Sequence, residues 1–362
     1  MIKRTKVLIV DDSAVIREFL RSVLSGEPDM EVVGAAADPF FARDKILSLR
    51  PDVITLDIEM PRMDGLTFLE KLMTAHPMPV VMFSKVTQSG AEATLQALRL
   101  GAVEVIAKPT SNLRANLPTL KQEIVSKIRA AARARVGPRT EAAQSVKTTP
   151  GLQGAAQQPA LPWRPARDMV VVMGASTGGT VALEKLLCAL PSDSPPLVVV
   201  QHLPAQFTQP FAQRLDNSAA IEVSQAEDFM PLTPGKALVA PGDRHVFLES
   251  NQRGYYLRVK DGPLVNHHKP SVDVLFRSAA GSAPGRALGV IMTGMGSDGA
   301  QGALEMRRQG CCVLAQDEAS SVIYGMARAA VELGAVDRIL PLEEIGPSIC
   351  RLWEGAQRRE AP

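Results

Sequence analysis

Cysteine, aromatic residues and excess charge are all scarce in this sequence. Its 362 residues include 4 cysteines and 4% aromatic residues, and 40 Lys plus Arg stand against 38 Asp plus Glu for a net charge of +2. The balanced charge argues against a chain-wide attraction to nucleic acid or to an anionic membrane. The cysteines lack C-x-x-C spacing, which argues against a zinc site, and we expect buried thiols in a reducing cytoplasm.

Long apolar runs are also missing. The first run, Val7 to Val10, is too short for the hydrophobic region of a signal peptide. No stretch approaches the roughly 20 apolar residues that a membrane-spanning helix needs. We therefore expect a cytoplasmic protein.

The length predicts two domains, because a domain averages roughly 150 residues. Between about residues 138 and 165 the sequence is rich in Pro, Gln, Ala, Thr and Gly and has no apolar periodicity, which is typical of a linker. We expect one domain over residues 4–125, a flexible linker over 126–166 and a second domain over 167–356.

Four arginines cluster where this linker begins. Nucleic-acid binding is one interpretation, but a solvated helix end is favoured because no aromatic residues are interleaved for base stacking and no helix-turn-helix pattern follows. The residues are Arg129, Arg133, Arg135 and Arg139.

Short apolar runs alternate with helical patterns in the first domain. Strands are expected in KVLIVDD, EVVGAAA, VITLD, VVMFS and EVIAK, and helices over 14–24, 40–49, 66–73, 91–100 and 117–128. Five strand–helix units imply a parallel sheet covered on both faces, a doubly wound α/β fold. The second domain repeats the pattern from VVVMGAS onward, with a strand-rich middle, so we expect a second doubly wound parallel-sheet domain.

Polar residues stand at the strand ends of the first domain. They are Asp11, Asp12, Asp57, Ser84 and Lys108, and strand ends converge on one edge of an open parallel sheet. Each aspartate alone could be a helix cap or turn residue. Together, three carboxylates suit Mg²⁺, Asp57 could attack a phosphoryl group, and Ser84 and Lys108 could bind its oxygens.

The second domain opens with a strand that leads into Gly174-Ala-Ser176-Thr-Gly178-Gly, a match to G-x-S-x-G at a strand-to-helix turn. A phosphate-binding glycine loop is the alternative. The next strand decides between them, because it ends in Gln201-His202 rather than in the acid of a dinucleotide site. His202 could act as the general base for Ser176.

A carboxylate should orient this histidine. The best candidate is Asp298, in the glycine-rich Thr293-Gly-Met-Gly-Ser-Asp298-Gly segment after a hydrophobic strand. Asp298 could instead be the N-cap of a helix that starts near Gly299. The agreement of three strand ends favours a Ser–His–Asp triad.

With these residues in view, residues 4–125 resemble a two-component receiver domain, which implies a flavodoxin-like fold. The resemblance rests on Asp11-Asp12, the DIEMPRMDG segment from Asp57, and Lys108-Pro109. It implies that Asp57 is the phosphoacceptor, that Asp11, Asp12 and Asp57 hold Mg²⁺, and that Ser84 and Lys108 are switch residues. The chain departs from the family at Val105, where receivers usually have an aromatic switch residue.

From about Val170 to Trp353 the chain resembles the catalytic domain of the chemotaxis methylesterase family CheB. GASTGG, QHLPAQFT, APGDRH, KPSVDVLF and TGMGSDGA occur in the family's order. The resemblance implies that Ser176 is the nucleophile, His202 the base and Asp298 its orienter. It also implies an oxyanion hole made by the backbone N–H groups of Thr177 and Met295, and no metal for the hydrolysis.

The two resemblances together imply a phosphorylation-activated serine esterase. It would hydrolyse glutamate methyl esters on methyl-accepting chemotaxis receptors, release methanol, and deamidate receptor glutamines. The histidine kinase CheA would be the phosphodonor, Mg²⁺ would serve the receiver only, and the chain would associate peripherally with receptor arrays. Two alternatives stay open: a second domain that only binds a partner, and a DNA-binding response regulator, which the missing helix-turn-helix disfavours.

Overall fold

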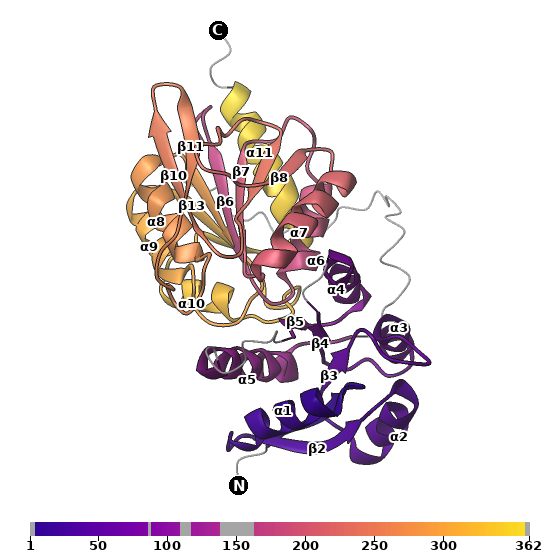
Figure 1. The fold of residues 1–362 in the computed structure, drawn as a ribbon. Helices are drawn as coiled ribbons and strands as arrows, with labels where there is room; N and C mark the ends of the chain where they lie inside the picture. The colour runs from indigo at the N-terminus through magenta and orange to yellow at the C-terminus, as the bar shows by residue number, and fades with distance from the viewer. Residues whose placement is uncertain (1–3, 86–87, 109–116, 138–162, 359–362) are drawn as a thin grey trace, which may run out of the picture.

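A computed structural model describes residues 4–85, 88–108, 117–137 and 163–358 of the chain. It contains two separate parallel sheets, each flanked by helices, with the N-terminal unit below the C-terminal unit in Figure 1. The expected α/β fold with two doubly wound parallel-sheet units is therefore confirmed. None of the described helices is both long and apolar enough to cross a membrane.

The N-terminal sheet has five parallel strands in the order β2-β1-β3-β4-β5. The strands are β1 (Thr5–Val10), β2 (Met30–Ala36), β3 (Val53–Asp57), β4 (Val80–Ser84) and β5 (Glu104–Ala107). The helices are α1 (Ala14–Ser25), α2 (Pro39–Leu49), α3 (Gly65–Ala75), α4 (Gln88–Leu100) and α5 (Leu117–Arg133). The strand order reverses between β1 and β3, and ligands bind beyond such a switch point in open α/β sheets.

Helix starts in this unit follow from short polar side chains. Ser13, Asp38 and Asp64 are the N-caps of α1, α2 and α3, and each accepts hydrogen bonds from backbone N–H groups of the first turn. These bonds satisfy donors that a helix leaves unpaired at its N-terminus. The caps therefore set where each strand-to-helix loop ends, at the edge that carries the acidic residues.

The C-terminal sheet has seven parallel strands in the order β14-β13-β12-β6-β7-β9-β8. They are β6 (Val170–Ala175), β7 (Leu197–Gln201), β8 (Glu222–Gln225), β9 (Lys236–Val239), β12 (Ala287–Ile291), β13 (Cys312–Gln316) and β14 (Arg338–Leu340). Its order reverses between β6 and β12. The central strands β6, β7, β12 and β13 are buried throughout, as is usual where helices cover both faces of a parallel sheet.

Helices and one hairpin complete this unit. The helices are α6 (Gly179–Cys188), α7 (Ala205–Ser218), α8 (Val272–Ser282), α9 (Ala300–Arg308), α10 (Met326–Glu332) and α11 (Leu342–Arg358). β10 (His245–Asn251) pairs antiparallel with β11 (Gly254–Lys260). The strand-rich middle expected over 221–258 is confirmed by β8 to β11.

The structure corrects two expectations, one about where the linker begins and one about the burial of the cysteines. The linker was expected from residue 126, but α5 continues to Arg133 because its apolar residues, Ile128 among them, pack into the N-terminal core. Residues 138–162, where most of the linker was expected, lie outside the described residues. Cys311 and Cys312 are buried as expected, whereas Cys188 is exposed.

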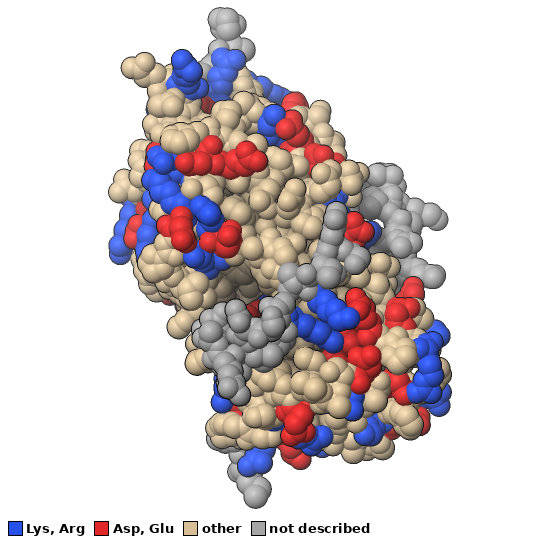
Figure 2. Space-filling view, viewed as in Figure 1, with Lys and Arg blue, Asp and Glu red and all other residues tan. Residues whose placement is uncertain are grey.

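Two of the clustered arginines form ion pairs in the structure. Arg129 binds Asp29 and Glu27 at 2.7 and 2.8 Å, and Arg135 binds Glu318 of the C-terminal unit at 2.9 Å. These pairs occupy side chains that nucleic-acid binding would need. Figure 2 shows basic and acidic residues interspersed on the face it draws, which also argues against a DNA-binding surface there.

The two units are in contact. Helix α4 lies against α6 and α7 (Figure 1), and Arg99 of α4 approaches Glu184 of α6 at 3.7 Å. Val322 of the C-terminal unit packs against the apolar core around α5 and β5, and its carbonyl accepts a hydrogen bond from the Arg135 N–H at 3.2 Å. The N-terminal unit therefore covers the end of the C-terminal sheet at which β6 and β7 finish.

Candidate active site

Ser176 lies at the turn between β6 and α6. Its N–H donates to the carbonyl of Thr293 at 3.0 Å, and its carbonyl accepts from Nε2 of Gln201 at 2.9 Å. Gly178 has a φ of 78°, a conformation that favours glycine. The turn is thus fixed by both neighbouring strand ends, and Ser176 is 9% exposed at its apex.

His202 follows directly from β7, the neighbour of β6. Ala175 pairs with Gln201 in the sheet, and the His202 N–H donates to the carbonyl of Ala175 at 3.1 Å. The imidazole Nε2 lies 2.9 Å from Oδ2 of Asp298, and its Nδ1 is buried with no hydrogen-bond partner among the described residues.

The bond to Asp298 determines which nitrogen of the His202 ring can accept a proton. An ionised carboxylate only accepts hydrogen bonds, so Nε2 carries the proton and Nδ1 is left as the acceptor. Among the described residues no hydrogen bond yet joins Nδ1 to the Ser176 hydroxyl. Catalytic hydrogen bonds often shorten only when substrate binds.

Asp298 is held by an array of donors. Besides His202, its oxygens accept bonds from the Ser271 hydroxyl (2.7 Å), the Asn266 amide (2.9 Å) and the N–H groups of Val272 and Asp273 (2.7 and 3.3 Å). Burial opposes ionisation, but these bonds and the neighbouring His202 hold the pKa of Asp298 well below its usual range. Asp298 is therefore a carboxylate at neutral pH.

Asp298 is not the N-cap of the helix that follows it. That helix, α9, has Gly299 as its N-cap with no side-chain hydrogen bond. Asp298 instead accepts from the first N–H groups of α8, and Asp273 of α8 accepts from the Gly302 N–H of α9 at 2.7 Å. Each helix start is therefore stabilised by a carboxylate of the other segment, and this places Asp298 beside His202.

Two backbone donors flank Ser176 without a partner. The N–H groups of Thr177 and Met295 form no hydrogen bond among the described residues. Thr293 connects their two loops, because its hydroxyl donates to the carbonyl of Thr177 at 2.9 Å. Unpaired N–H groups at such a place can stabilise an oxyanion.

The other predicted cluster lies at the switch point of the N-terminal sheet. Carboxylate oxygens of Asp11, Asp12 and Asp57 lie within 4.8 Å of one another. Lys108 Nζ lies 2.8 Å from Asp11 and 2.7 Å from Asp57. Burial raises the pKa of Asp57 to about 6, against the opposing effect of Lys108. Three oxygen donors at this spacing fit a small divalent cation.

Of the two other residues predicted for this cluster, Lys108 contacts the carboxylates and Ser84 does not. Lys108 bridges two of the carboxylates, but the Ser84 hydroxyl donates away from them, to the carbonyls of Lys85 or Gly90, both at 3.3 Å. Val105, at the position where an aromatic residue was expected in receivers, is buried, and its carbonyl accepts from Lys127 Nζ at 2.7 Å.

Comparison with known proteins identifies the family. The family model described as CheB methylesterase matches residues 171–349, and the one described as response regulator receiver domain matches residues 7–117. A protein from Anaeromyxobacter dehalogenans, named protein-glutamate methylesterase/protein-glutamine glutaminase 5, is 52% identical over 96% of each chain. The chain belongs to the CheB family.

Further relatives agree over the full length. The protein-glutamate methylesterase/protein-glutamine glutaminase 3 of Geobacter metallireducens is 48% identical over 97% of this chain and 99% of its own. The crystal structure of the Thermotoga maritima CheB methylesterase catalytic domain matches 51% of this chain and 98% of its own, at 35% identity and a TM-score of 0.50. As a CheB-family member the chain is a hydrolase with an N-terminal response-regulator receiver.

Sequence reasoning missed two residues beside Ser176, His202 and Asp298. The ring of His268 stacks on that of His202, with centroids 3.7 Å apart and planes 9° from parallel. Asn266 donates to Asp298. Asn266 and His268 lie in the loop before α8 and not at the end of a strand, so the pattern of polar residues at strand ends does not point to them. Their position just before KPSVDVLF was the available signal.

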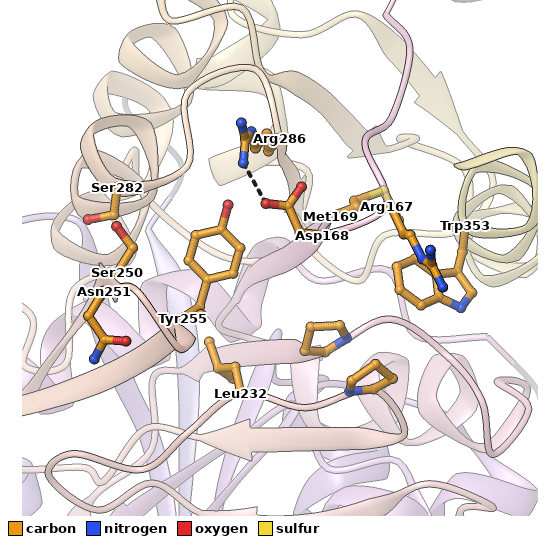
Figure 3. Close-up of a pocket in the computed structure, with 13 residues that line it drawn as sticks. Arg167, Asp168, Met169, Leu232, Ser250, Asn251, Tyr255, Ser282, Arg286 and Trp353 are labelled. Carbon is orange, nitrogen blue, oxygen red and sulfur yellow. Dashed lines mark hydrogen bonds and ion pairs between the residues drawn. The ribbon is translucent and has the colours of Figure 1, made fainter. Parts of the chain in front are cut away.

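A cavity of about 340 Å³ lies elsewhere in the CheB-type domain (Figure 3). Asp168 and Met169 precede β6 and Arg286 precedes β12, so the cavity is at the opposite edge of the sheet from Ser176. Asp168 pairs with Arg286 at 2.6 Å across it, as the dashed line in Figure 3 marks. This cavity is therefore separate from the Ser–His–Asp cluster.

Proposed function

We propose that this chain is a phosphorylation-activated serine hydrolase that demethylates glutamate methyl esters on methyl-accepting chemotaxis receptors. The observation that carries this proposal is the His202–Asp298 bond at Nε2, which leaves Nδ1 buried and unpartnered on a residue whose backbone is bonded to Ala175, next to Ser176. The names of the full-length relatives supply the substrate class.

Hydrolysis proceeds through an acyl-enzyme. The Ser176 hydroxyl attacks the ester carbonyl and passes its proton to Nδ1 of His202, while Asp298 stabilises the imidazolium. The oxyanion accepts hydrogen bonds from the Thr177 and Met295 N–H groups. The C–OCH₃ bond breaks, the methoxide takes the His202 proton, and methanol leaves.

Water completes the reaction. Nδ1 of His202 takes a proton from a water molecule, the hydroxide attacks the acyl carbon, and Ser176 leaves with that proton. The product is a free glutamate side chain. A glutamine side chain presents the same carbonyl geometry, so the same residues deamidate receptor glutamines and release ammonia.

The receiver regulates this chemistry. Asp57 accepts a phosphoryl group from the histidine kinase CheA, which works on the same receptor arrays in the cytoplasm, and Lys108 pairs with the phosphoryl oxygens. Asp11, Asp12 and Asp57 would hold Mg²⁺, which when bound offsets charge on the phosphoryl oxygens. Ser84 serves as a switch residue that turns toward this group.

Contacts between the units support an inhibited unphosphorylated state. The Thr177 hydroxyl, next to the nucleophile, donates to Oε1 of Glu104 in the receiver at 2.5 Å, and both side chains are buried. A receiver seated here excludes a helical receptor from Ser176. Phosphorylation weakens this packing and opens the site.

We place the boundary between the two domains in the segment around residues 138–162.

Substitution of the phosphoacceptor tests the regulation. Asp57→Asn should leave the basal methanol release intact and abolish its stimulation by acetyl phosphate with Mg²⁺. Stimulation that survives the substitution would refute the role of Asp57. A second domain that only binds a partner would instead release no methanol in any condition.

A further inference from the structure

The loop between β11 and α8 makes a tight turn beside the catalytic imidazole. Val265 and His268 exchange both backbone hydrogen bonds, at 3.0 and 2.9 Å. Between them Asn266 and His267 have φ of 51° and 66°. Residues other than glycine rarely adopt this left-handed backbone conformation, and Asn and His are among those that tolerate it best. Positive φ at both central residues defines a type I′ turn.

Asn266 uses this conformation to join two buried carboxylates. Its Nδ2 donates to Oδ1 of Asp298 at 2.9 Å and to Oδ2 of Asp273 at 2.7 Å. Both hydrogens of the amide nitrogen are therefore used. The turn is thus anchored to the oxygen of Asp298 that does not bind His202.

The same turn places His268 flat on His202. The ring centroids are 3.7 Å apart, and the planes are within 9° of parallel. A ring held by one hydrogen bond at Nε2 can still tilt about that bond. A second contact across its face removes this freedom and fixes the direction in which Nδ1 points.

The charge of His268 decides whether the stacking favours the reaction. The titratable groups whose charges act on His268 are His202, Asp298, Lys127 and His267, and of these the ring of His202 is in direct contact with it. Burial lowers the pKa of His268 to about 3, so its ring is neutral at working pH. The face of a neutral aromatic ring attracts a cation, and His202 becomes a cation when it takes the Ser176 proton.

We propose that His268 is a positioning residue that fixes the ring plane of His202, so that Nδ1 meets the Ser176 hydroxyl, and that the Asn266–His267 turn exists to deliver it. This inference rests on the proposed role of Ser176 as the nucleophile. It requires a flat neutral ring at position 268 but not the ring nitrogens, so phenylalanine should replace histidine and leucine should not.

The test measures nucleophile activation separately from receptor chemistry. Full-length chain with acetyl phosphate and Mg²⁺ is reacted with a small fluorophosphonate, and the rate of covalent labelling of Ser176 is followed by mass spectrometry. Wild type is compared with His268→Phe, His268→Leu and the control His76→Leu, which makes the same change at an exposed histidine of the receiver. Methanol release from methylated receptors gives kcat and KM for the same proteins.

We expect His268→Leu to label Ser176 about 10- to 100-fold more slowly than wild type, because small displacements of a catalytic group have such effects. His268→Phe should stay within about 3-fold of wild type because it keeps a flat neutral ring, and His76→Leu should stay within about 2-fold because it leaves the geometry at His202 unchanged. For methanol release, kcat of His268→Leu should fall by the factor seen in labelling with KM unchanged, since the ring does not bind the receptor.

Three results would count against the inference. Labelling of His268→Leu at the wild-type rate would overturn it, and so would a His268→Phe rate as low as that of His268→Leu. A wild-type chain that is not labelled at Ser176 would overturn both this inference and the proposed serine mechanism. Labelling that follows the expected order without any methanol release would support the positioning role and refute only the proposed substrate.

Discussion

The contact between Glu104 and Thr177 gives the sharpest test of how the receiver controls the site. Glu104, on β5 of the receiver, is 8% exposed, and its Oε1 accepts from the Thr177 hydroxyl at 2.5 Å. Its Oε2 lies 3.9 Å from Nζ of Lys127. Glu104→Ala removes this carboxylate from the contact between the two units. The buried Thr177 hydroxyl then loses its acceptor, and Lys127 loses one neighbouring negative charge.

The expected size of the effect follows from this one bond. A hydrogen bond to a charged group contributes about 1.5–3 kcal/mol. Since about 1.4 kcal/mol corresponds to a factor of ten, losing the bond should raise the open fraction of unphosphorylated chain roughly 10-fold or more. The rate of the phosphorylated chain, already open, should not change.

The assay is methanol release from methylated receptor membranes without and with acetyl phosphate and Mg²⁺. Glu123→Gln is the matched control, because Glu123 also pairs with Lys127, at 2.9 Å, but bonds to no residue of the C-terminal unit in the part of the chain that the structure describes. A folded Glu104→Ala chain with an unchanged basal rate would refute the view that this contact keeps the site closed. A fall in both rates would show that Glu104 supports the active site instead.

Three further predictions concern single residues. Asp298→Asn should lower kcat for methanol release about 10⁴-fold, because an amide cannot favour the same His202 tautomer; a loss below about 10-fold would contradict the triad. Burial raises the pKa of Asp57 to about 6, so its ionisation destabilises the fold as the pH rises from about 4 to 6. Asp57→Asn should therefore raise the free energy of unfolding at pH 7.5 by at most about 3 kcal/mol, and by less at pH 4. Urea unfolding without Mg²⁺ measures both values. Gly294→Ala would place a methyl group against Sδ of Met326, whose flexible side chain can shift, and 2.8 Å from Cβ of Ser176. It should lower kcat about 10- to 100-fold with the fold intact by circular dichroism.

Most of the fold could be read from the sequence because each strand is a short buried apolar run between helical patterns. The functional residues at strand ends could be predicted for the same reason, since parallel strands bring their ends to one edge. Ser176 and His202 follow neighbouring strands, and Asp11 and Asp57 flank the switch point of the receiver sheet.

What sequence reasoning missed depends on tertiary contacts. His268 reaches His202 through a tight turn whose two left-handed residues carry no period. Glu104 sits inside an ordinary strand pattern, and only the packing of two units shows its bond to Thr177. Asp298 was recognised, but its bonds to the first N–H groups of α8 rather than α9 depend on how the two helix starts face each other.

We expect Ser176 to perform receptor demethylation under the control of the receiver. The most direct measurement is methanol release from methylated receptor membranes by wild type and Ser176→Ala, each with and without acetyl phosphate and Mg²⁺. Release that requires Ser176 and increases with the phosphodonor is the predicted result. Equal release by Ser176→Ala would refute the role of Ser176 as the nucleophile, and no release by wild type in any condition would refute receptor demethylation.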